Sequence, residues 1–282
     1  MTTATSELSQ VFARQIADKR LTLPTMPGTA SEVMALCQQE DTDAAKLSSV
    51  IHNDQTIASN VLRVANSAAY VGTVPCASLQ QAVSRLGLQL ITEIAMAVSV
   101  RGRMFGNPQC ADLLAALWQH SVLTGFFTKE IARMRRRNVE IAFLCGLLHD
   151  VGKAVLLDNI DRVLGKRELK IPVPDMLAAI EEQHIPAGRM LSIEWKLPDQ
   201  IAESIEHHHD FESAERFQDM AMTVCLADLL SHVIVPNVFY TELSADDLRA
   251  HPVLAGLNMY SDQVDELLAL KERALAVTEG MQ

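Results

Sequence analysis

The segment Phe143-Leu144-Cys145-Gly146-Leu147-Leu148-His149-Asp150-Val151-Gly152-Lys153 carries the strongest signal in the chain. An apolar run leads directly into an adjacent histidine and aspartate, so two good metal ligands stand where the preceding pattern points into a core. Taken alone, a His-Asp pair is most often structural, with the histidine satisfied in the core and the aspartate capping a helix or pairing with a base. A metal site requires further ligands elsewhere in the chain.

Ligands of this kind do recur, each inside an otherwise apolar, helix-like segment: His120, His184, the run His207-His208-His209-Asp210, and Asp228. Imidazole and carboxylate groups from separate helices can converge on one or two divalent ions. Asp228 stands among leucine and alanine residues and would be costly to bury without a partner. Successive residues of a helix are rotated by about 100°, so at most two of the three consecutive histidines can face one cavity, and we leave His207 out of the site.

Composition limits the class of protein. Among 282 residues, 49% are hydrophobic and 21% are charged, with 12 glycines and 10 prolines, which is typical of a soluble and largely helical chain. The formal net charge of −11 disfavours a broad nucleic-acid-binding face. The one basic cluster, 133–137, is interpreted as a solvated helix end.

Cysteine usage and hydropathy indicate the compartment. The five cysteines form no Cys-x-x-Cys pair and are interpreted as reduced core thiols. No apolar run reaches the roughly 18 residues of a membrane span, and the first residues are polar and unlike a signal peptide. We therefore expect a cytoplasmic protein without a membrane-spanning segment.

The predicted fold class is all-α, because no alternation typical of strands and no repeat of fixed period is found. The expected helices cover 7–19, 31–39, a segment from Asp43 through Ile51, 56–65, 78–87, 91–100, 111–133, 140–148, 153–157, 174–183, 187–195, 199–210, 221–233 and 262–278. Pro24 and Pro27 predict an extended segment after the first helix.

A series of short motifs shows a family resemblance. In the first half they are Leu23-Pro24, Ile51 with Asp54, Leu62-Arg63 with Asn66-Ser67-Ala68, and Ser78-Leu79-Gln80-Gln81-Ala82 with Leu86-Gly87. In the second half they are Leu117-Trp118-Gln119-His120-Ser121, the 146–153 segment, Trp195-Lys196-Leu197-Pro198, the three histidines 207–209, and Ala227-Asp228. With these motifs in this order from 21 to 232, the chain resembles the HDOD proteins, a branch of the HD-domain superfamily of metal-dependent phosphohydrolases. Gln55, where the family usually has proline, is one departure.

The resemblance implies an all-helical protein in which an N-terminal helical lobe packs on an HD-domain-like bundle. The expected division is an N-terminal helix at 1–20, the N-terminal lobe at 21–105, and the HD-like lobe with a closing C-terminal helix at 106–282. The superfamily's minimal metal set maps onto His120, His149, Asp150 and Asp228. A second ion, as in the related HD-GYP phosphodiesterases, would add His184, His208 and His209, with Asp150 bridging. Every one of these positions is filled here.

Asp150 and Lys153 are the residues expected to act in catalysis. Two ions about 3.5 to 4 Å apart would neutralise charge on a phosphate ester, with Asp150 as the central catalytic carboxylate. Lys153 follows it by three residues, so its ammonium could steady a phosphate oxygen; a solvated lysine near a helix start is the equal alternative.

Ala116 stands where some HD-GYP proteins place an extra carboxylate, which disfavours a third ion. The Gly-Tyr-Pro signature is absent after His209-Asp210, so cyclic di-GMP has no support as the substrate.

Two classes of function follow from the resemblance. The first is an HDOD-type signal-transduction module whose HD-like lobe holds a metal or small ligand and whose N-terminal lobe meets a signalling protein partner. The alternative is a phosphohydrolase that depends on one or two divalent ions (iron, manganese, nickel, zinc or magnesium) and acts on a nucleotide or other phosphate ester. The Asn66-Ser67 pair is expected to have a structural role at the junction of the lobes.

Overall fold

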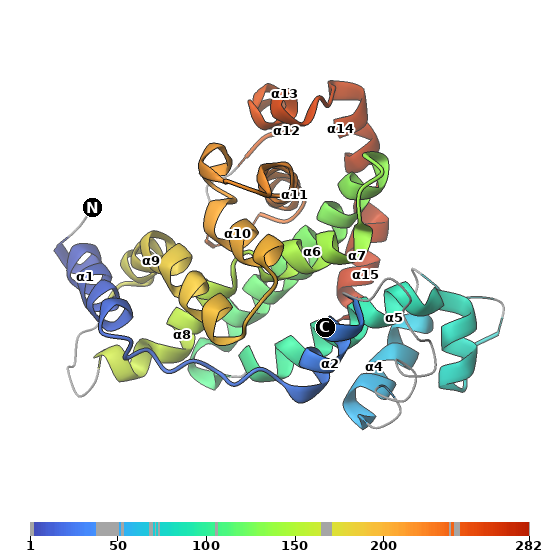
Figure 1. Cartoon of the computed structure of the whole chain (residues 1–282), viewed down its shortest axis with the longest axis horizontal. Coiled ribbons are helices and arrows are strands. Elements are labelled where there is room, and N and C mark those ends of the chain that lie inside the picture. Colours follow the sequence, from blue (N-terminus) through green and yellow to red (C-terminus); the bar gives the residue numbers. More distant parts are fainter. Residues whose placement is uncertain are drawn as a thin grey trace.

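The computed structural model describes residues 3–37, 51, 54–67, 70, 72, 74–104, 107–164, 171–236, 238–239 and 243–281. This part of the chain is helical and contains no strand, as predicted (Figure 1). The helices are α1 Thr3–Ala17, α2 Gly28–Cys37, α4 Gln55–Ala65, α5 Leu79–Met104, η1 Pro108–Cys110, α6 Ala111–Met134, α7 Val139–Leu148, α8 Val151–Leu164, α9 Val173–Glu194, α10 Asp199–His207, η2 Phe211–Ser213, α11 Gln218–Ile234, α12 Ala245–Ala250, α13 Val253–Leu257, α14 Ser261–Leu268 and α15 Lys271–Gly280. The helix expected from Asp43 falls on residues outside these ranges, except at Ile51.

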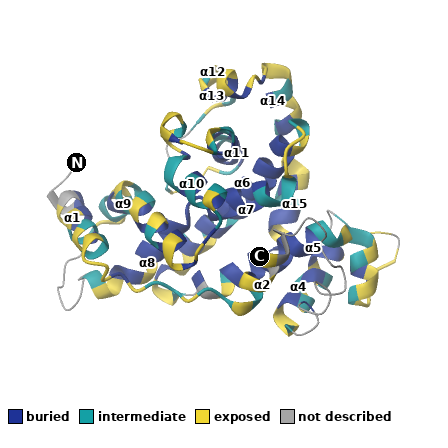
Figure 2. Cartoon of the chain, in the orientation of Figure 1, coloured by how far each residue is buried: buried dark blue, intermediate teal, exposed yellow. Residues whose placement is uncertain are grey.

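Helix α6 forms the centre of the protein, and α7 and α11 pack along it. Every residue of α6 from His120 to Ala132 is buried, and so is every residue of α7 from Ala142 to Leu148 (Figure 2). A helix enclosed in this way must satisfy any polar side chain it carries inside the protein. On α6, Lys129 pairs with Glu93 on α5 and Thr124 bonds Ser231 on α11, whereas Thr128 donates to a carbonyl of α6 itself.

Two of the predicted helix divisions differ from the structure. The two helices expected over 174–183 and 187–195 are one continuous helix, α9, with Pro186 inside it. The ring of Pro186 is exposed, while Ala187, Gly188 and Leu191 are buried in a helix that packs against α8 and α10. This tertiary packing offsets the hydrogen bond that proline removes from the helix.

The single helix expected over 262–278 is wrong, because the chain turns at Ala269 and Leu270 and forms α14 and α15. The turn sends α15 between α4 and α6, where Ala274 and Val277 are buried. By contrast, the helices expected over 78–87 and 91–100 do meet at a break: Gly87 has φ 76° and ψ 160°, a conformation that favours glycine.

The first helix and the extended segment after it pack on the second half of the chain. Helix α1 lies against α9, where Thr5 Oγ1 donates a hydrogen bond to Asp175 Oδ1 at 2.7 Å. In the extended segment, the Pro24 carbonyl accepts a 2.8 Å bond from Trp195 Nε1. The segment predicted from the two prolines is thus tied to the helices that carry the histidines.

The Asn66-Ser67 turn makes hydrogen bonds within the first half of the chain, and its predicted role at the junction of the lobes remains a prediction. The Asn66 side chain accepts from the Cys76 backbone nitrogen at 2.7 Å and donates to its carbonyl at 3.0 Å. A Cβ added to Gly280 on α15, which contacts both α4 and α6, would lie 3.5 Å from Ser67. The turn therefore closes the loop before α5 and borders α15.

Two predictions from composition can be compared with these residues. Cys76, Cys110, Cys145 and Cys225 are buried free thiols. One described helix, spanning 79–102, is long and apolar enough to cross a membrane, and 56% of its most apolar window is buried inside the protein. Its burial and its break at Gly87 are those of a core helix.

Candidate metal centre

The junction between α7 and α8 places the His-Asp pair in the interior. Helix α7 ends at Leu148 and α8 begins at Val151, so His149 and Asp150 form the short turn between two buried helices. Both are 1% exposed. The Lys153 backbone nitrogen donates to the Asp150 carbonyl at 2.9 Å and closes the turn.

Glycines bring the neighbouring helices close to this turn. A Cβ on Gly152 would lie 1.9 Å from the His184 carbonyl oxygen, which shows how closely α8 approaches α9. A Cβ on Gly146 would lie 2.3 Å from Thr128 Oγ1 on α6, and one on Gly188 would lie 2.7 Å from Ile205 on α10. The absence of side chains at these positions is what lets histidines from three other helices reach Asp150.

One group of ligand atoms gathers around the Oδ2 side of Asp150. His149 Nε2 lies 3.4 Å and His120 Nε2 3.9 Å from this oxygen, and the two Nε2 atoms are 3.3 Å apart. Asp228 Oδ1 from α11 lies 2.9 Å from His120 Nε2 and 3.5 Å from His149 Nε2. The four residues of the predicted minimal set therefore converge.

A second group gathers around the other oxygen of the same carboxylate. Asp150 Oδ1 lies 3.5 Å from His184 Nε2 and 3.6 Å from His208 Nε2. His209 completes a set of four whose ligand atoms all lie within 4.8 Å of one another. Asp150 thus stands between the two groups, with one oxygen toward each.

The hydrogen bonds of the imidazoles fix their orientation. The Nδ1 atoms of His149, His184 and His208 each contact a backbone carbonyl, at Gly146 (2.7 Å), Glu181 (2.5 Å) and Ile205 (3.0 Å). A carbonyl oxygen only accepts, so each Nδ1 carries the proton and each Nε2 faces the carboxylate. Metal-binding histidines are held in this way.

The donor set fits a divalent cation. The buried Nε2 atoms of His184 and His208 have no hydrogen-bond partner among the described residues, although Asp150 Oδ1 lies only 3.5 Å and 3.6 Å from them. Burial lowers the pKa of His184 well below its usual value, so its ring is neutral at pH 7 and its Nε2 offers a lone pair. A lone pair that faces a carboxylate oxygen is repelled unless a positive charge lies between them.

Charges in the centre follow from the same burial. Burial would raise the pKa of Asp150, but Lys153 and His149 outweigh it and hold that pKa well below its usual value. Burial would lower the pKa of His149, but Asp150 and Asp228 outweigh it and raise the pKa to about 10. A positive charge is thus favoured where the His149 ring meets the two carboxylates.

Lys153 is not the solvated lysine that the sequence left as an equal alternative. It is fully buried, and its Nζ lies 2.8 Å from Asp150 Oδ2 and 2.9 Å from Glu181 Oε2. Burial would lower its pKa, but the two carboxylates outweigh this effect and raise it, so the side chain is an ammonium ion. Its predicted contact with a phosphate remains a prediction.

The three consecutive histidines divide at the end of α10: His207 is its last residue, and His208 and His209 lie beyond it, so the helix expected to run to Asp210 is shorter than predicted. His208 is fully buried at the centre, and the His209 ring lies 4.0 Å from it, with a side chain that is 43% exposed. His207 lines a surface hollow beside Glu203 and Glu206 instead. Leaving His207 out of the site agrees with this arrangement.

Two residues at the centre were missed by the sequence analysis, His232 and Glu181. His232 Nε2 lies 3.0 Å from Asp228 Oδ1, and its ring stacks on that of His120 at 4.7 Å. The four-residue spacing of Asp228 and His232, which puts both on one face of α11, could have revealed it. Glu181 precedes His184 by three residues, which is the corresponding signal on α9.

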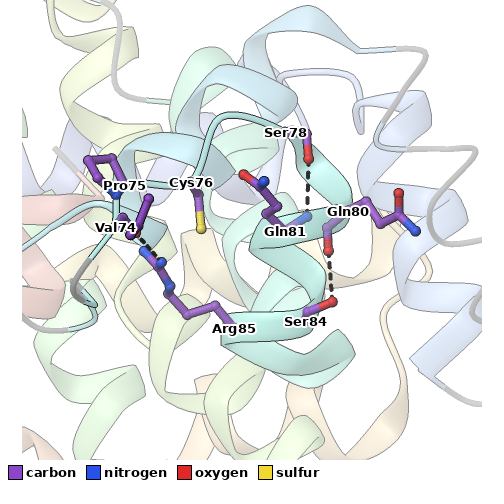
Figure 3. A pocket seen from close by; sticks show the side chains of 8 residues that line it. All are labelled: Val74, Pro75, Cys76, Ser78, Gln80, Gln81, Ser84 and Arg85. Carbon is purple, nitrogen blue, oxygen red and sulfur yellow. Dashed lines mark hydrogen bonds between the residues drawn. The ribbon is translucent and has the colours of Figure 1, made fainter.

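A separate surface hollow is lined by the segment before α5 and by the first turns of α5, including the motif residues Ser78, Gln80 and Gln81 (Figure 3). Its polar groups are used locally: Arg85 donates to the carbonyls of Val74 and Ala65, and Gln81 Oε1 accepts from the Ala77 nitrogen. Ser84 donates to the carbonyl of Gln80. The bonds of Arg85 and Gln81 hold the segment before α5 against the start of that helix.

Comparison with known proteins identifies a matching domain family and a related bacterial protein. The model of the HDOD domain family matches residues 23–211. A protein of Treponema pallidum (strain Nichols) is 27% identical over 228 residues, which is 77% of this chain and 44% of that protein. The chain therefore spans less than half the length of that curated relative.

Solved structures share the fold. An HDOD domain protein from Geobacter sulfurreducens has a TM-score of 0.74 at 20% identity, covering 98% of this chain and 99% of its own. A candidate metal-dependent phosphohydrolase from Shewanella amazonensis has a TM-score of 0.73 at 19% identity over 100% of both chains. A candidate signal-transduction protein from Marinobacter aquaeolei has a TM-score of 0.72 at 21% identity, covering 99% of this chain and 66% of its own.

Proposed function

The chain belongs to the HDOD family, whose domain model matches more than half of it, and from this membership and the geometry of the centre we propose a regulatory module that holds one or two divalent metal ions in its HD-like half. The proposed ligands are His120, His149, Asp150 and Asp228 for one ion, and Asp150, His184, His208 and His209 for the other. One observation carries the proposal: the Nε2 atoms of His184 and His208, orientated by their Nδ1 hydrogen bonds, face the buried Asp150 carboxylate and have no hydrogen-bond partner among the described residues.

A regulatory role is supported by the enclosure of this centre. The side chains of His120, His149, Asp150, His184, His208 and Asp228 are at most 6% exposed. An ion held so deeply stabilises the arrangement of α6 to α11, so its arrival or loss would change the stability of the whole HD-like half. The name of the Marinobacter protein is consistent with signalling.

Phosphate-ester hydrolysis is the second candidate, favoured by the complete ligand set and by the name of the Shewanella protein. Divalent ions bound here would neutralise charge on phosphate oxygens and lower the pKa of a water molecule. The chain itself supplies the ammonium of Lys153 beside Asp150, and buried helices that exclude bulk water. Iron, manganese, nickel and zinc suit the imidazole-rich donor set better than magnesium does.

Metal content is the first test of the proposal. Wild type is expected to carry about one or two transition-metal ions per chain, and Asp150→Asn is expected to lose them, because the carboxylate faces both ligand groups. Asp158→Asn, an exposed position on α8, makes the same charge change as a control. Elemental mass spectrometry of the untagged proteins measures the difference; wild type without metal after loading would contradict the proposal.

A screen of phosphomonoesters and phosphodiesters with added manganese then separates the two candidates. Turnover by wild type that disappears in Asp150→Asn would establish hydrolysis. Metal binding without turnover would leave the regulatory module. In either case the proposed setting is the cytoplasm, with a protein partner that reads the metal-bound form; recovery of the protein in a membrane fraction would contradict that setting.

His232 is expected to strengthen metal binding by holding Asp228. Its Nε2 lies 3.0 Å from Asp228 Oδ1, so His232→Ala frees a carboxylate that contacts two of the proposed ligands. We expect about a 10- to 100-fold loss of metal affinity. Competition with a chromogenic chelator measures it, and His207→Ala, outside the centre, is the matched control. An equal shift in both variants would show that the effect is not specific to His232.

A further inference from the structure

Solvent reaches the centre at one edge, formed by Glu181 and His209. Their side chains are 39% and 43% exposed, whereas those of Asp150 and Lys153, directly beneath, are at most 1% exposed. Any soluble ligand that approaches these residues from this edge meets Glu181 first.

At this edge the Glu181 carboxylate spans two nitrogen groups. Its Oε2 lies 2.9 Å from Lys153 Nζ, and its Oε1 lies 3.6 Å from His209 Nε2. Oε2 is itself inaccessible to solvent, so the carboxylate is inserted into the centre while the rest of the side chain remains at the surface. The backbone carbonyl of the same residue separately holds His184 Nδ1 at 2.5 Å.

We propose that Glu181 fills a phosphate-binding position at Lys153 and His209, and that a phosphate group binds there only when the Glu181 carboxylate leaves. This inference rests on the proposed function, because the metal centre lies directly behind that position.

The charges at this edge support the exchange. The Lys153 ammonium at this edge already contacts two carboxylates, those of Asp150 and Glu181. A phosphate approaching His209 would therefore meet the negative charge of Glu181 while the ammonium is engaged. A phosphate can take over both contacts, since it offers several strong acceptor oxygens to an ammonium and an imidazole.

Departure of the Glu181 carboxylate breaks one of the two ion pairs of Lys153 and leaves the other, with Asp150, in place. Long, partly exposed side chains of α-helices change rotamer readily. Rotation of the side chain leaves the backbone bond to His184 in place, so the proposed metal ligand keeps its orientation. Departure of the carboxylate therefore exposes Lys153 without disturbing the ligand set.

The test compares Glu181→Gln with Glu182→Gln, the exposed neighbour that makes the same charge change one residue further along α9. Each full-length protein is loaded with manganese, desalted, assayed for metal by mass spectrometry, and titrated calorimetrically with inorganic phosphate. We expect Glu181→Gln to bind phosphate at least about tenfold more tightly than wild type, and Glu182→Gln to stay within about twofold. Glu181→Ala, which removes the whole carboxylate, is expected to match or exceed Glu181→Gln.

Three results would overturn the inference. Equal phosphate affinity of the Glu181 and Glu182 variants would show that Glu181 does not occupy the position. Loss of manganese from Glu181→Gln would assign the carboxylate to the metal instead. Absence of manganese from every protein, wild type included, would overturn the proposed metal centre and this inference with it, whereas the first two results leave the metal centre standing.

Discussion

Replacing Gly152 with alanine is expected to destabilise the protein by about 4 kcal/mol or more, because the new methyl group has no space. Its Cβ would lie 1.9 Å from the His184 carbonyl oxygen and 2.6 Å from the Gly188 nitrogen. Both are backbone atoms, so no side-chain rotation can relieve the overlap, and α8 and α9 must move apart. Thermal unfolding followed by circular dichroism should show a midpoint lower by roughly 10 °C.

Gly102→Ala provides the matched control for this prediction. Gly102 lies in α5, and a Cβ there would have no heavy atom within 4 Å. Alanine favours helix more than glycine does, so this variant is expected to gain up to about 1 kcal/mol. Equal destabilisation by both substitutions would show that close packing of α8 on α9 is not the cause. The Gly152 variant should also lose metal affinity, since His184 moves with α9.

Breaking the buried ion pair between α5 and α6 is the second large effect. Lys129 Nζ lies 2.6 Å from Glu93 Oε2, and both side chains are at most 8% exposed. Lys129→Ala would leave the Glu93 carboxylate buried without its cation, at an expected cost of about 3 to 5 kcal/mol in the free energy of unfolding. Chemical denaturation at pH 7 measures this cost.

The pH dependence and the double variant distinguish the mechanism. Burial raises the pKa of Glu93 and outweighs the attraction of Lys129, so this acid takes up its proton at a higher pH in the folded protein than in the unfolded chain. A raised folded pKa gives stability that is present at low pH and lost as the pH rises through that pKa. The penalty of Lys129→Ala should therefore shrink as the pH falls toward the ordinary glutamate value of about 4.3.

Replacing both partners, with Glu93→Leu and Lys129→Met together, is expected to be neutral or stabilising. The apolar surroundings of Lys129, which lies near the rings of Phe126 and Phe143, favour such a replacement. A double variant as unstable as the single one would show that the pair itself, and not the unpaired charge, carries the stability.

Helix boundaries show where prediction from sequence reaches its limit. The all-α class and most helices followed from apolar periodicity, because that pattern is a local property of the chain. Apolar periodicity did not predict that α9 continues through Pro186 or that the chain turns between α14 and α15. Each of these features depends on what the helix packs against. The helix propensity of single residues is overridden where the buried contacts of the helix contribute more stabilising free energy than that propensity does.

The candidate centre divides in the same way. His120, His149, Asp150, His184, His208, His209 and Asp228 were selected from residue type, apolar surroundings and family resemblance, and the structure brings their ligand atoms together. Glu181 and His232 were not selected, and Lys153 was left between a solvated and a phosphate-binding role. Their surroundings are set by α9 and α11, which lie far from α8 in the sequence.

The sequence by itself determined that the chain is helical, that it belongs with the HDOD proteins, and which side chains could bind a metal, since residue chemistry and local periodicity are written along the chain. Only the tertiary structure decided that Asp150 turns one oxygen toward each ligand group, that Lys153 is buried between two carboxylates, and that Glu181 stands at the solvent edge. These relations depend on the close approach of helices at Gly152 and its counterparts, and such distances exist only after the helices have packed.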